Sequence, residues 1–262
     1  MIFEKSSTRT RVSFEVGMYQ LGGQALFLSN RDLQIGRGEP IKDTARVLSR
    51  YLDGVMIRTF GHEIVEEFAQ YASIPVINAL TDLLHPCQAL TDLLTAQEHK
   101  GKDLKGLKMA YIGDGNNMTH SLMYACAKVG MNFASASPKG YEPNAQVVAN
   151  AKLDAAQSGS TIEILNDPFA AAKDADILYT DVWASMGQEA EHDERVKIFK
   201  DYQINNELLS VADKRAIVMH CLPAHRGEEI AEDVLEKNAN VIFDEAENRL
   251  HTQKAIMALL MG

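Results

Sequence analysis

The sequence has few cysteines, no long apolar run and fewer basic than acidic residues, and each of these shortages excludes a class of protein. Its three cysteines are far apart, odd in number and in no CxxC arrangement, so they indicate neither a disulfide framework nor a thiolate metal site. No apolar run approaches membrane-spanning length, and the first five residues lack the basic segment and apolar core of a secretion signal. We therefore expect a soluble, cytoplasmic protein with no membrane partner.

Acidic residues outnumber basic ones by 36 to 26, and the formal net charge at pH 7 is -10. This charge argues against a protein that coats nucleic acid or an anionic membrane, although it is compatible with a local basic pocket for a small anion. The 262 residues, of which 46% are hydrophobic, are enough to bury a sizeable core in two domains or one large one. Any anion site is therefore expected to be concentrated in a few residues.

Short apolar, β-branched runs alternate with longer amphipathic ones, which is the rhythm of β-α-β units. The first series of predicted strands comprises residues 1–4, 24–28, 55–57 and 76–79. The second series comprises residues 107–112, 132–136, 161–165, 176–180, 216–219 and 241–243. The pattern predicts an α/β protein of two domains, each a parallel sheet flanked by helices.

A polar, glycine-marked stop at residues 100–102 ends the helix that is predicted to begin near Pro86. We place the domain boundary there, with residues 1–100 in one domain and residues 101–245 in the other. The last predicted helix lies within residues 246–262, and its packing face is predicted to hold Ala255, Ile256, Leu259 and Leu260. The residue pattern alone allows this helix to pack on either domain.

Candidate chemistry begins with the run STRTR at residues 7–11, which follows the first predicted strand and precedes a helical pattern. Hydroxyl groups, guanidinium groups and free backbone N–H groups are thereby collected at a helix N-terminus, where the helix dipole also favours negative charge. A phosphate group would bind well there. An ordinary capped and solvated helix start explains the run equally well, because capping residues are common.

A second candidate is the run HPCQ, in which His85 and Gln88 follow another predicted strand and open a helix. Open α/β sheets bind ligands at the carboxyl ends of their strands. His85 is suited to donate a hydrogen bond to a carbonyl oxygen that becomes an oxyanion, and Gln88 to accept one from an adjacent NH2 group. Taken alone, His85 is more simply explained as a structural histidine with a hydrogen-bond partner.

Three more polar segments follow predicted strands. Arg58 ends the third strand, Asp181 begins the run DVWASMG, and Cys221 lies in the run HCLP. A carboxylate with a hydroxyl and backbone donors suits an α-amino acid, whereas a lone arginine at a strand end or a lone buried cysteine is usually structural. Because all five segments lie at carboxyl ends of strands, together they indicate a ligand-binding cleft.

The run GDGNN at residues 113–117 resembles the opening of a dinucleotide-binding fold only weakly. Met118 stands where the third glycine of that fingerprint belongs, and no acidic residue ends the next strand to bind a ribose. We therefore expect no nucleotide at this turn.

Along nearly its whole length the chain resembles the aspartate/ornithine carbamoyltransferase family, and within it the ornithine branch. FEKSSTRTR at residues 3–11 and HPCQ at 85–88 resemble the wider family, whereas SMG at 185–187 and HCLP at 220–223 are specific to that branch. The resemblance implies a first domain that binds carbamoyl phosphate, a second that binds the amino acid, and a last helix that returns to the first. It also implies a homotrimer with active sites between subunits, and N-terminal helices that we expect this sequence to lack.

The resemblance further assigns residues to the two substrates. For carbamoyl phosphate it implies Ser7, Thr8, Arg9, Thr10, Gln34, Arg58, His85, Gln88, Cys221, Leu222 and Arg249. For ornithine it implies Asn117, Asp181, Ser185 and Met186. Gln34 is expected to act across a subunit boundary.

The implied reaction is attack of the neutral δ-amine of ornithine on the carbamoyl carbon, giving citrulline and phosphate without a cofactor or a metal. Presenting a lysine-like amine, with a pKa of about 10.4, in its neutral form at about pH 7.5 costs about 4 kcal/mol. We expect Asp181 and Cys221 to orient the amine and handle its proton. Arg58, Thr10 and His85 are expected to stabilise the oxyanion.

Three alternatives stay open. The acceptor can be another amine, such as aspartate, putrescine or a modified ornithine. A protein without the usual N-terminal helices can bind carbamoyl phosphate and yet be catalytically impaired. A nucleotide-dependent oxidoreductase is the least favoured, because residues 113–117 match its fingerprint poorly.

Overall fold

The computed structural model describes residues 1–29, 33–34, 38–184 and 189–262. The chain divides into two compact units, one formed by Met1–Gln88 with Glu247–Gly262 and the other by Ala89–Ala246. This division falls inside helix α4 (Pro86–Lys100), whereas the sequence places a domain boundary at the end of that helix.

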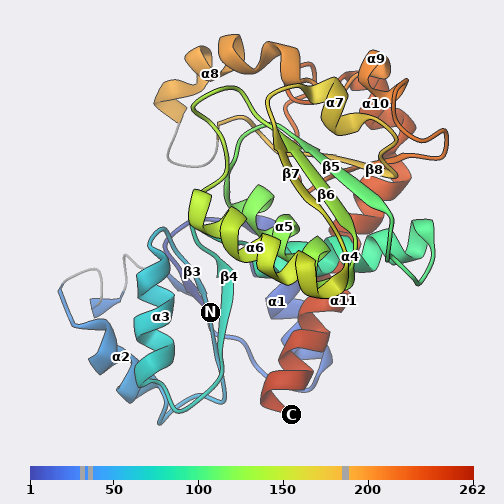
Figure 1. The fold of residues 1–262 in the computed structure, drawn as a ribbon. Helices are drawn as coiled ribbons and strands as arrows, with labels where there is room; N and C mark the ends of the chain where they lie inside the picture. The colour runs from blue at the N-terminus through green and yellow to red at the C-terminus, as the bar shows by residue number, and fades with distance from the viewer. Residues whose placement is uncertain (30–32, 35–37, 185–188) are drawn as a thin grey trace. The chain divides into compact units, whose positions relative to one another are not determined.

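The first unit is built on a four-stranded parallel sheet in the order β2-β1-β3-β4 (Figure 1). Its strands are β1 (Ile2–Phe3), β2 (Leu28–Ser29), β3 (Val55–Arg58) and β4 (Val76–Leu80). The chain passes from β1 to β2 on one side and returns to β3 on the other side of β1. The strand order therefore reverses between β1 and β3, and a ligand is expected beyond the carboxyl ends of these two strands.

Helices cover both faces of this sheet because alternate side chains of its strands are apolar on both faces. One face packs against α1 (Thr8–Gln20) and the C-terminal part of α11 (Ala239–Met261). That cluster contains Phe3, Phe14, Met56, Ile77 and Met257. The other face packs against α2 (Ile41–Leu48) and α3 (His62–Tyr71). That cluster contains Ile2, Ala45, Val55, Ile57, Val65 and Phe68.

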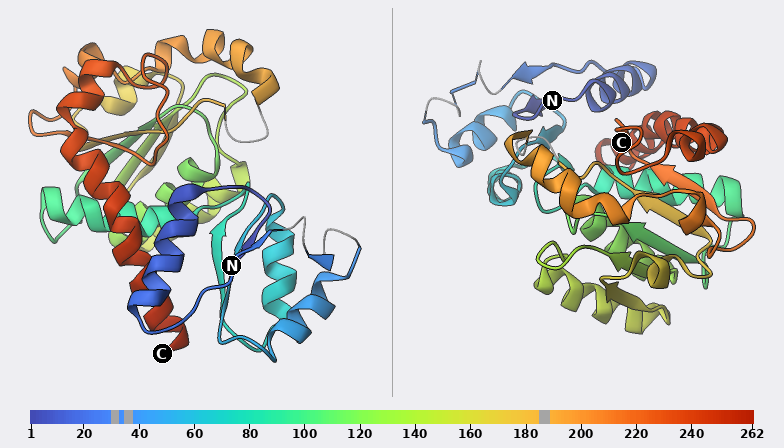
Figure 2. Two further views of the ribbon diagram at one scale, coloured as in Figure 1. Left: turned by 180° about the vertical axis from the view of Figure 1, so that it is seen from behind. Right: turned by 90° about the horizontal axis from the view of Figure 1, so that it is seen from above.

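Helix α1 and the C-terminal part of α11 lie side by side, as both views in Figure 2 show in blue and red. A Cβ atom on Gly17 of α1 would lie 3.0 Å from Cε of Met257 and 3.1 Å from Cγ of Lys254. The absence of a side chain at position 17 therefore allows a close approach of the two helices. This approach lets Arg249 and Gln253 of α11 reach residues of α1.

The second unit is built on a five-stranded parallel sheet in the order β7-β6-β5-β8-β9. Its strands are β5 (Lys108–Ile112), β6 (Asn132–Ala136), β7 (Ile162–Leu165), β8 (Ile177–Thr180) and β9 (Ile217–His220). Here the strand order reverses between β5 and β8. A ligand is again expected beyond the carboxyl ends of that pair.

Helices also cover both faces of the second sheet. One face packs against α4, α5 (Asn117–Val129) and α6 (Ala145–Ser158). The other packs against α7 (Pro168–Ala172), α9 (Asn206–Leu209) and α10 (Glu232–Lys237). Helix α8 (His192–Phe199) lies between two short 3-10 turns, Glu189–Glu191 and Lys200–Tyr202. The predicted fold class is therefore confirmed, with two parallel sheets that are each flanked by helices.

The predicted strand at residues 241–243 is wrong, because these residues lie in α11. Val241 and Ile242 are buried, Phe243 is 55% exposed, and Glu245 is the next buried residue, which is the period of a helix. Three apolar residues are too few to separate a strand from a helix by periodicity. The predicted strand at residues 24–28 also begins too early, since β2 is only Leu28–Ser29.

The predicted packing face of the last helix is wrong for three of its four residues. Ile256 packs against the core cluster that contains Phe14 and Met257, but Ala255 is exposed, and Leu259 and Leu260 are 83% and 50% exposed. The buried residues after Ala246 are Asn248, Arg249, Gln253 and Met257. Three of these four are polar, so a search for apolar residues misses most of the buried face.

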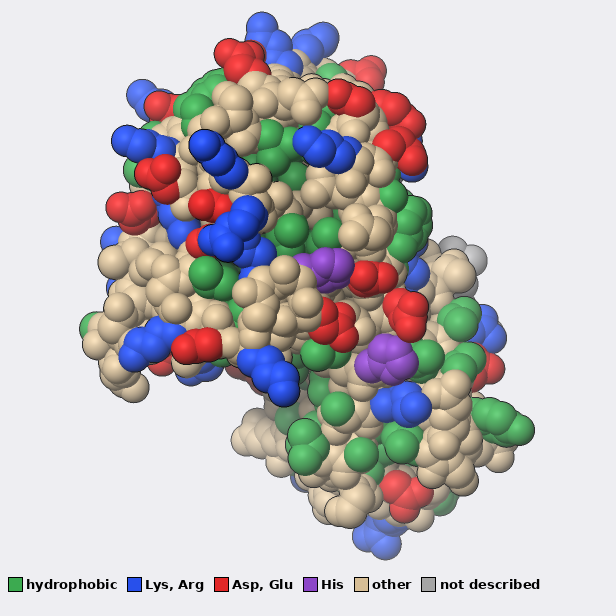
Figure 3. Space-filling view, turned by 90° about the vertical axis from the view of Figure 1, so that its right-hand side faces the viewer, with side chains coloured by type: hydrophobic (Ala, Val, Ile, Leu, Met, Phe, Trp, Pro, Cys, Tyr) green, Lys and Arg blue, Asp and Glu red, His purple; other side chains and the backbone are tan. Residues whose placement is uncertain are grey.

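No helix among the described residues is long and apolar enough to cross a membrane. On the face drawn in Figure 3, the described Lys and Arg side chains lie among Asp and Glu side chains and form no broad basic patch.

Candidate active site

In the first unit, α1 begins with the run predicted to bind phosphate. Ser7 caps the helix, since its Oγ accepts a hydrogen bond from Thr10 N (3.2 Å) and donates one to Thr10 Oγ1 (3.1 Å). Arg58 ends the adjacent strand, and its carbonyl accepts from Glu4 N (2.9 Å). The helix start and Arg58 therefore stand at the β1–β3 reversal, where the topology predicts a ligand.

Arg249 joins this group from the far end of the sequence. Its Nη1 donates to Gln88 Oε1 (2.7 Å) and its Nη2 donates to Thr10 Oγ1 (3.1 Å). All three side chains are buried, and these two acceptors are neutral. A guanidinium group stays charged in proteins, and its attraction for an anion is stronger where water is excluded. The arrangement therefore suits a small anion.

Gln253, one helical turn after Arg249, orients that guanidinium. The hydrogen-bond partners of the Gln253 side chain determine the positions of its amide oxygen and nitrogen. The oxygen accepts from Arg249 Nε (3.1 Å) and Nη2 (2.7 Å), and the nitrogen donates to Ser13 Oγ (2.5 Å). Because Gln253 is fully buried and uncharged, it holds Arg249 in place without neutralising it.

His85, just before α4, is buried beside the same positive charges. Burial of the imidazole, together with the charges of Arg249 and Arg58, holds the pKa of His85 well below its usual value of 6.5. The ring is therefore neutral at neutral pH, with one nitrogen able to donate and the other able to accept. A neutral donor beside two arginines is suited to stabilise a developing oxyanion.

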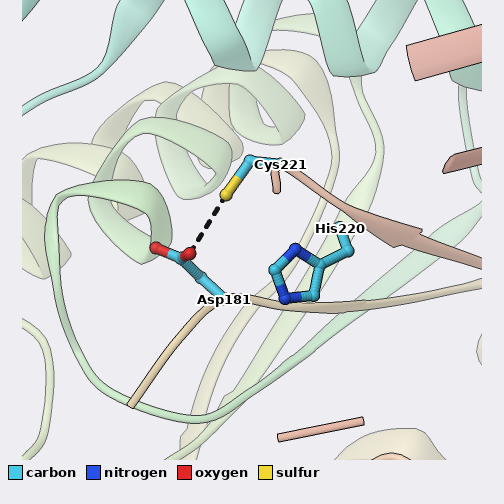
Figure 4. A group of neighbouring side chains, drawn as sticks. All are labelled: Asp181, His220 and Cys221. Atoms are coloured by element: carbon cyan, nitrogen blue, oxygen red, sulfur yellow. Dashed lines mark hydrogen bonds between the residues drawn. The ribbon is translucent and has the colours of Figure 1, made fainter. Parts of the chain in front are cut away.

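In the second unit, Asp181 follows β8 and Cys221 follows the neighbouring strand β9 (Figure 4). The Asp181 carboxylate accepts three hydrogen bonds. Oδ1 accepts from Cys221 Sγ (3.1 Å) and Val182 N (2.8 Å), and Oδ2 accepts from Asn116 Nδ2 (3.3 Å). The carboxylate is thus held in one orientation at the carboxyl ends of β5, β8 and β9, where it can receive an ammonium group.

Cys221 is a thiol in this environment, not a thiolate. Burial, followed by the negative charges of Asp181 and Glu245, raises the pKa of Cys221 well above its usual value of 9.0. A thiol is a weak hydrogen-bond donor and a poor nucleophile. Cys221 therefore acts on Asp181 and on a ligand by hydrogen bonding and contact.

Both ring nitrogens of His220 are engaged in holding the segment that follows β9. Nδ1 accepts from Leu222 N (2.9 Å), so the proton of the neutral ring is on Nε2, which donates to Glu229 Oε1 (3.0 Å). Leu222 has a φ of +54°, which is unfavourable for leucine and is stabilised by that backbone hydrogen bond. Although ligand atoms of Asp181, His220 and Cys221 lie within 4.8 Å of one another, His220 has no nitrogen to spare for a metal.

The turn after β5 is fixed from two sides. Asn116 caps α5 by accepting from Met118 N and Thr119 N, and Tyr111 OH donates to the same oxygen (3.3 Å). A Cβ atom on Gly115 would lie 2.3 Å from backbone atoms of residues 142–143, so only glycine fits there. The weak dinucleotide resemblance therefore reflects a tight turn that aims Asn116 at Asp181.

Arg195 of α8 stabilises the same turn from the other side. Its Nη1 donates to Asp114 Oδ2 (2.8 Å) and to the carbonyl oxygen of Trp183 (2.7 Å). Arg195 and Asp114 are both buried. This ion pair therefore ties the loop after β5 to the loop after β8.

Glu245 is a second buried acid behind Cys221. Its Oε1 accepts from Tyr179 OH (3.1 Å) and its Oε2 accepts from His220 N (2.9 Å). Burial, and secondly the negative charge of Asp92, raise the pKa of Glu245 well above its usual value of 4.5. The surroundings of Glu245 therefore disfavour its charged form, and Asp181 is the carboxylate that faces the β5–β8 reversal.

The structure brings together most, but not all, of the residues that the sequence singles out. Thr10, Arg58, His85, Gln88 and Arg249 cluster in the first unit; Asp181, Cys221 and Leu222 cluster in the second. Ser7 takes part as the helix cap, while Thr8 is exposed and Arg9 partly exposed in the first turn of α1. Asn117 opens α5 next to Asn116.

Three assigned residues are not placed in these clusters. Gln34 is exposed, and its carbonyl accepts from Glu39 N (3.1 Å) within its own loop. Ser185 and Met186 lie outside the described residues, so their assignment to ornithine stays a prediction.

Four residues that shape the two clusters were not predicted from the sequence: Asn116, Arg195, Glu245 and Gln253. Asn116 carries a usable signal, because an asparagine before a helical pattern is a typical N-cap. The other three act through partners that are distant in sequence. Gln253 and Ser13, for example, are 240 positions apart.

Comparisons with known proteins agree with this geometry. Residues 1–98 match the family model described as aspartate/ornithine carbamoyltransferase, carbamoyl-P binding domain, and residues 105–260 match the Asp/Orn binding domain of the same family. The ornithine carbamoyltransferase of Anoxybacillus flavithermus is 65% identical over 261 residues, which are 100% of this chain and 83% of that protein. That of Thermococcus kodakarensis is 60% identical over 262 residues, again 100% and 83%.

Solved structures show the same likeness. The ornithine carbamoyltransferase of Pyrococcus furiosus matches with a TM-score of 0.96 at 57% identity, covering 100% of this chain and 83% of that chain. The anabolic enzyme of Campylobacter jejuni matches with a TM-score of 0.94 at 47% identity, covering 99% and 86%. Matches to both domain models and to relatives of this identity lead to one conclusion: the chain belongs to the aspartate/ornithine carbamoyltransferase family.

Proposed function

We propose that the chain is an ornithine carbamoyltransferase, which transfers the carbamoyl group of carbamoyl phosphate to the δ-amine of L-ornithine. The observation that carries the proposal is the presence of two sites of complementary charge, each at the strand-order reversal of its own sheet. Buried arginines suit carbamoyl phosphate, and the oriented carboxylate of Asp181 suits an ammonium group. The names of relatives that are 57% to 65% identical support ornithine as the acceptor.

On the first unit, the phosphate group is assigned to the start of α1 and to arginines. Backbone N–H groups and hydroxyls in the first turn of a helix bind phosphate well, and the helix dipole adds to the attraction. Arg58 and Arg249 supply positive charge from β3 and α11. Residues assigned to the phosphate are Ser7, Thr8, Arg9, Thr10, Arg58 and Arg249, and Gln34 is proposed to reach it from a neighbouring subunit.

The carbamoyl group is assigned to His85 and Gln88. Neutral His85 donates to the carbonyl oxygen, and Arg58 and Thr10 share in stabilising that oxygen as its charge grows. Gln88 Oε1 accepts from Arg249, and an amide oxygen has two lone pairs, so it is an acceptor of the kind that the carbamoyl NH2 group requires. We assign Cys221 and the strained Leu222 to the same group, as the resemblance implies.

On the second unit, ornithine is assigned to Asp181 and to neighbours of the β5 turn. Asp181 is fixed by hydrogen bonds from Cys221 and Asn116, so a substrate ammonium meets an acceptor that needs no reorganisation. Asn117, one residue further along, is assigned to the same ligand. Ser185 and Met186 complete the proposed ornithine site.

The proposed reaction forms one bond and breaks one. The neutral δ-amine attacks the carbamoyl carbon, the C–N bond forms, and the carbonyl oxygen becomes an oxyanion. Collapse of this intermediate restores the carbonyl and breaks the C–O bond to phosphate. The amine proton passes to the leaving phosphate, with Asp181 and the Cys221 thiol orienting the amine while it does so.

The relatives also suggest the direction of the reaction, the compartment and the assembly. We propose the biosynthetic direction, which leads toward arginine, because two relatives are named anabolic. We also propose a cytoplasmic homotrimer. The absence of a disulfide among the three cysteines supports the cytoplasm, and the family resemblance supports the trimer. Sedimentation velocity tests the assembly, and a monomer at active concentrations contradicts it.

The test of the function is citrulline formation from carbamoyl phosphate and ornithine, run beside aspartate and putrescine as acceptors. We expect turnover with ornithine alone. Efficient carbamoylation of another amine would show that the acceptor is wrong while the family chemistry is right. Calorimetric binding of carbamoyl phosphate without turnover of any amine would favour a binding protein over an enzyme.

A further inference from the structure

Three side chains of the second unit that take no part in the proposed reaction converge at one point. His192 is the first residue of α8, and His225 and Glu228 lie in the segment after β9. Nε2 of His192 lies 3.1 Å from Glu228 Oε2, and Nδ1 of His225 lies 3.5 Å from the same oxygen. One ligand atom from each of the three residues lies within 4.8 Å of the others.

The two distances to Glu228 are close to those between neighbouring ligands of a tetrahedral metal site. Two ligands that each lie about 2.0–2.1 Å from zinc, at the tetrahedral angle, are about 3.3 Å apart. The two distances to Glu228 fall on either side of that value. We propose that His192, His225 and Glu228 form a binding site for a divalent transition-metal ion, with zinc as the best fit to two imidazoles and one carboxylate.

The surrounding structure positions the ligands in advance. Gln203 Nε2 donates to the carbonyl of Glu228 (2.8 Å), and His225 N donates to the buried carboxylate of Glu229 (2.6 Å). The imidazole rings of His192 and His225 meet edge to face, with centroids 5.8 Å apart. Little backbone ordering is therefore required when an ion binds.

An outer partner is also present. Metal-binding histidines usually donate their second ring N–H to a carboxylate or a carbonyl group. Nδ1 of His192, the nitrogen that faces away from Glu228, lies 3.5 Å from Asp193 Oδ1. Asp193 is fully exposed and lies at ion-pair distance, so it is the carboxylate that can serve as this outer partner when an ion is bound.

Partial exposure makes this site accessible. The side chains of His192, His225 and Glu228 are 36%, 42% and 29% exposed, so an ion can enter from solvent and keep water as its fourth ligand. The group of Asp181, His220 and Cys221 differs, because both nitrogens of His220 are already hydrogen-bonded. A bound ion would fasten α8 to the segment after β9, which stabilises the second unit.

The test is titration of Co2+, a spectroscopic substitute for Zn2+, into full-length protein stripped with a chelator. We expect one ion per chain, with visible d–d absorption and no thiolate-to-cobalt charge-transfer band. His192→Ala and Glu228→Gln should each weaken binding by about 100-fold or more, since loss of an outer partner alone costs roughly 10- to 100-fold. Zn2+ should raise the Tm of the parent protein but not of these variants.

Two controls locate the ion. His251 lies 3.4 Å from Glu247 but belongs to no group of three ligands among the described residues, so His251→Ala should bind Co2+ like the parent. Cys221→Ser should also retain the d–d bands. A charge-transfer band that disappears in Cys221→Ser, unchanged binding by His192→Ala, or no binding at all would each overturn the proposal. None of these results bears on citrulline formation, so the proposed function stands or falls separately.

Discussion

The two units place their functional groups at the same topological position but with opposite charge. In the first unit the reversal between β1 and β3 gathers Arg58, Arg249 and a neutral His85. In the second unit the reversal between β5 and β8 presents Asp181, with a thiol and an amide as donors. The sheet topology therefore determines where a ligand binds, and a few side chains determine which ligand it is.

Neutral side chains orient the charged group at each site. Gln88, Thr10 and Gln253 hold Arg249 with amide and hydroxyl groups. Asp181 accepts hydrogen bonds from uncharged donors in the same way. These hydrogen bonds fix the orientation of the two charged groups without adding an opposite charge of their own.

The largest expected effect is on the first unit. Arg58→Ala removes a buried cation that is proposed to stabilise the oxyanion, and we expect kcat to fall by about 10²–10³, or about 2.7–4 kcal/mol. Steady-state citrulline assays measure this. Arg50→Ala, at an exposed arginine of the same unit, is the matched control and should keep the parent kcat. An unchanged kcat in Arg58→Ala would remove Arg58 from the mechanism.

On the second unit, Asp181→Asn keeps the size of the side chain and removes its charge. A hydrogen bond to a charged group contributes about 1.5–3 kcal/mol, so kcat/KM for ornithine should fall by roughly 10- to 150-fold. Asp154→Asn, at a surface residue that pairs with Lys128 (2.9 Å), should have little effect. Equal kcat/KM in Asp181→Asn and the parent would show that ornithine binds elsewhere.

Gln253→Glu makes the first site more like the second by placing a carboxylate against Arg249. A negative charge roughly 8 Å from bound phosphate repels it by about 2 kcal/mol at an effective dielectric constant of about 20, which is about 30-fold in Kd. We expect this loss of affinity without loss of thermal stability, because the carboxylate still accepts from Arg249. Gln253→Ala separates the two roles, since it should lower stability as well as affinity. Unchanged carbamoyl phosphate affinity in Gln253→Glu would contradict the role of Arg249.

The two units also differ in the pH dependence of their stability, and this effect is expected to be small within any one pH unit. His85 has a lowered pKa, so below about pH 6.5 the unfolded chain binds more protons and the stability that the native state gains from neutral His85 is lost as pH falls. Glu245 has a raised pKa, so above about pH 4.5 the native state binds more protons and stability is lost as pH rises. Each effect changes the free energy of unfolding by about 1.4 kcal/mol per pH unit within its window.

Urea unfolding between pH 5 and 8 measures both slopes. The difference in unfolding free energy between the parent and His85→Gln should rise with pH up to about 6.5 and then level off. The difference in unfolding free energy between the parent and Glu245→Gln should fall as pH rises from 5 to 8. If the unfolding free energies of a variant and the parent change with pH in parallel, the pKa shift described for the substituted group is wrong.

Local patterns in the sequence predict the sheets well and the last helix badly. Strands such as Ile177–Thr180 are buried on both faces and follow from their apolar runs. The three apolar residues at 241–243 are too few to show a period, so they suggest a strand where the structure has a helix. Leu259 and Leu260 misled in the same way, since the buried face of α11 is polar where it meets the site.

In the candidate site, too, some residues can be predicted from local sequence patterns and others cannot. Residues within motifs, such as Thr10 and Cys221, stand out because an unusual run of side chains surrounds them. Gln253 and Arg195 do not, because each acts on a partner brought to it only by folding, Ser13 and Asp114 in these cases. The resemblance assigns Asn117 to ornithine, which stays a prediction, and a helix-capping argument adds its neighbour Asn116.

The division of labour between the two units is tested most directly by calorimetric titration of carbamoyl phosphate into Asp181→Asn and Arg58→Ala. If the cationic site of the first unit supplies most of the affinity for this substrate, Asp181→Asn should keep a Kd close to that of the parent and Arg58→Ala should lose at least about tenfold, as expected for a lost charge-assisted hydrogen bond. Equal losses in the two variants, or a loss in Asp181→Asn only, would contradict the assignment of the cationic site to carbamoyl phosphate and of the acidic site to ornithine.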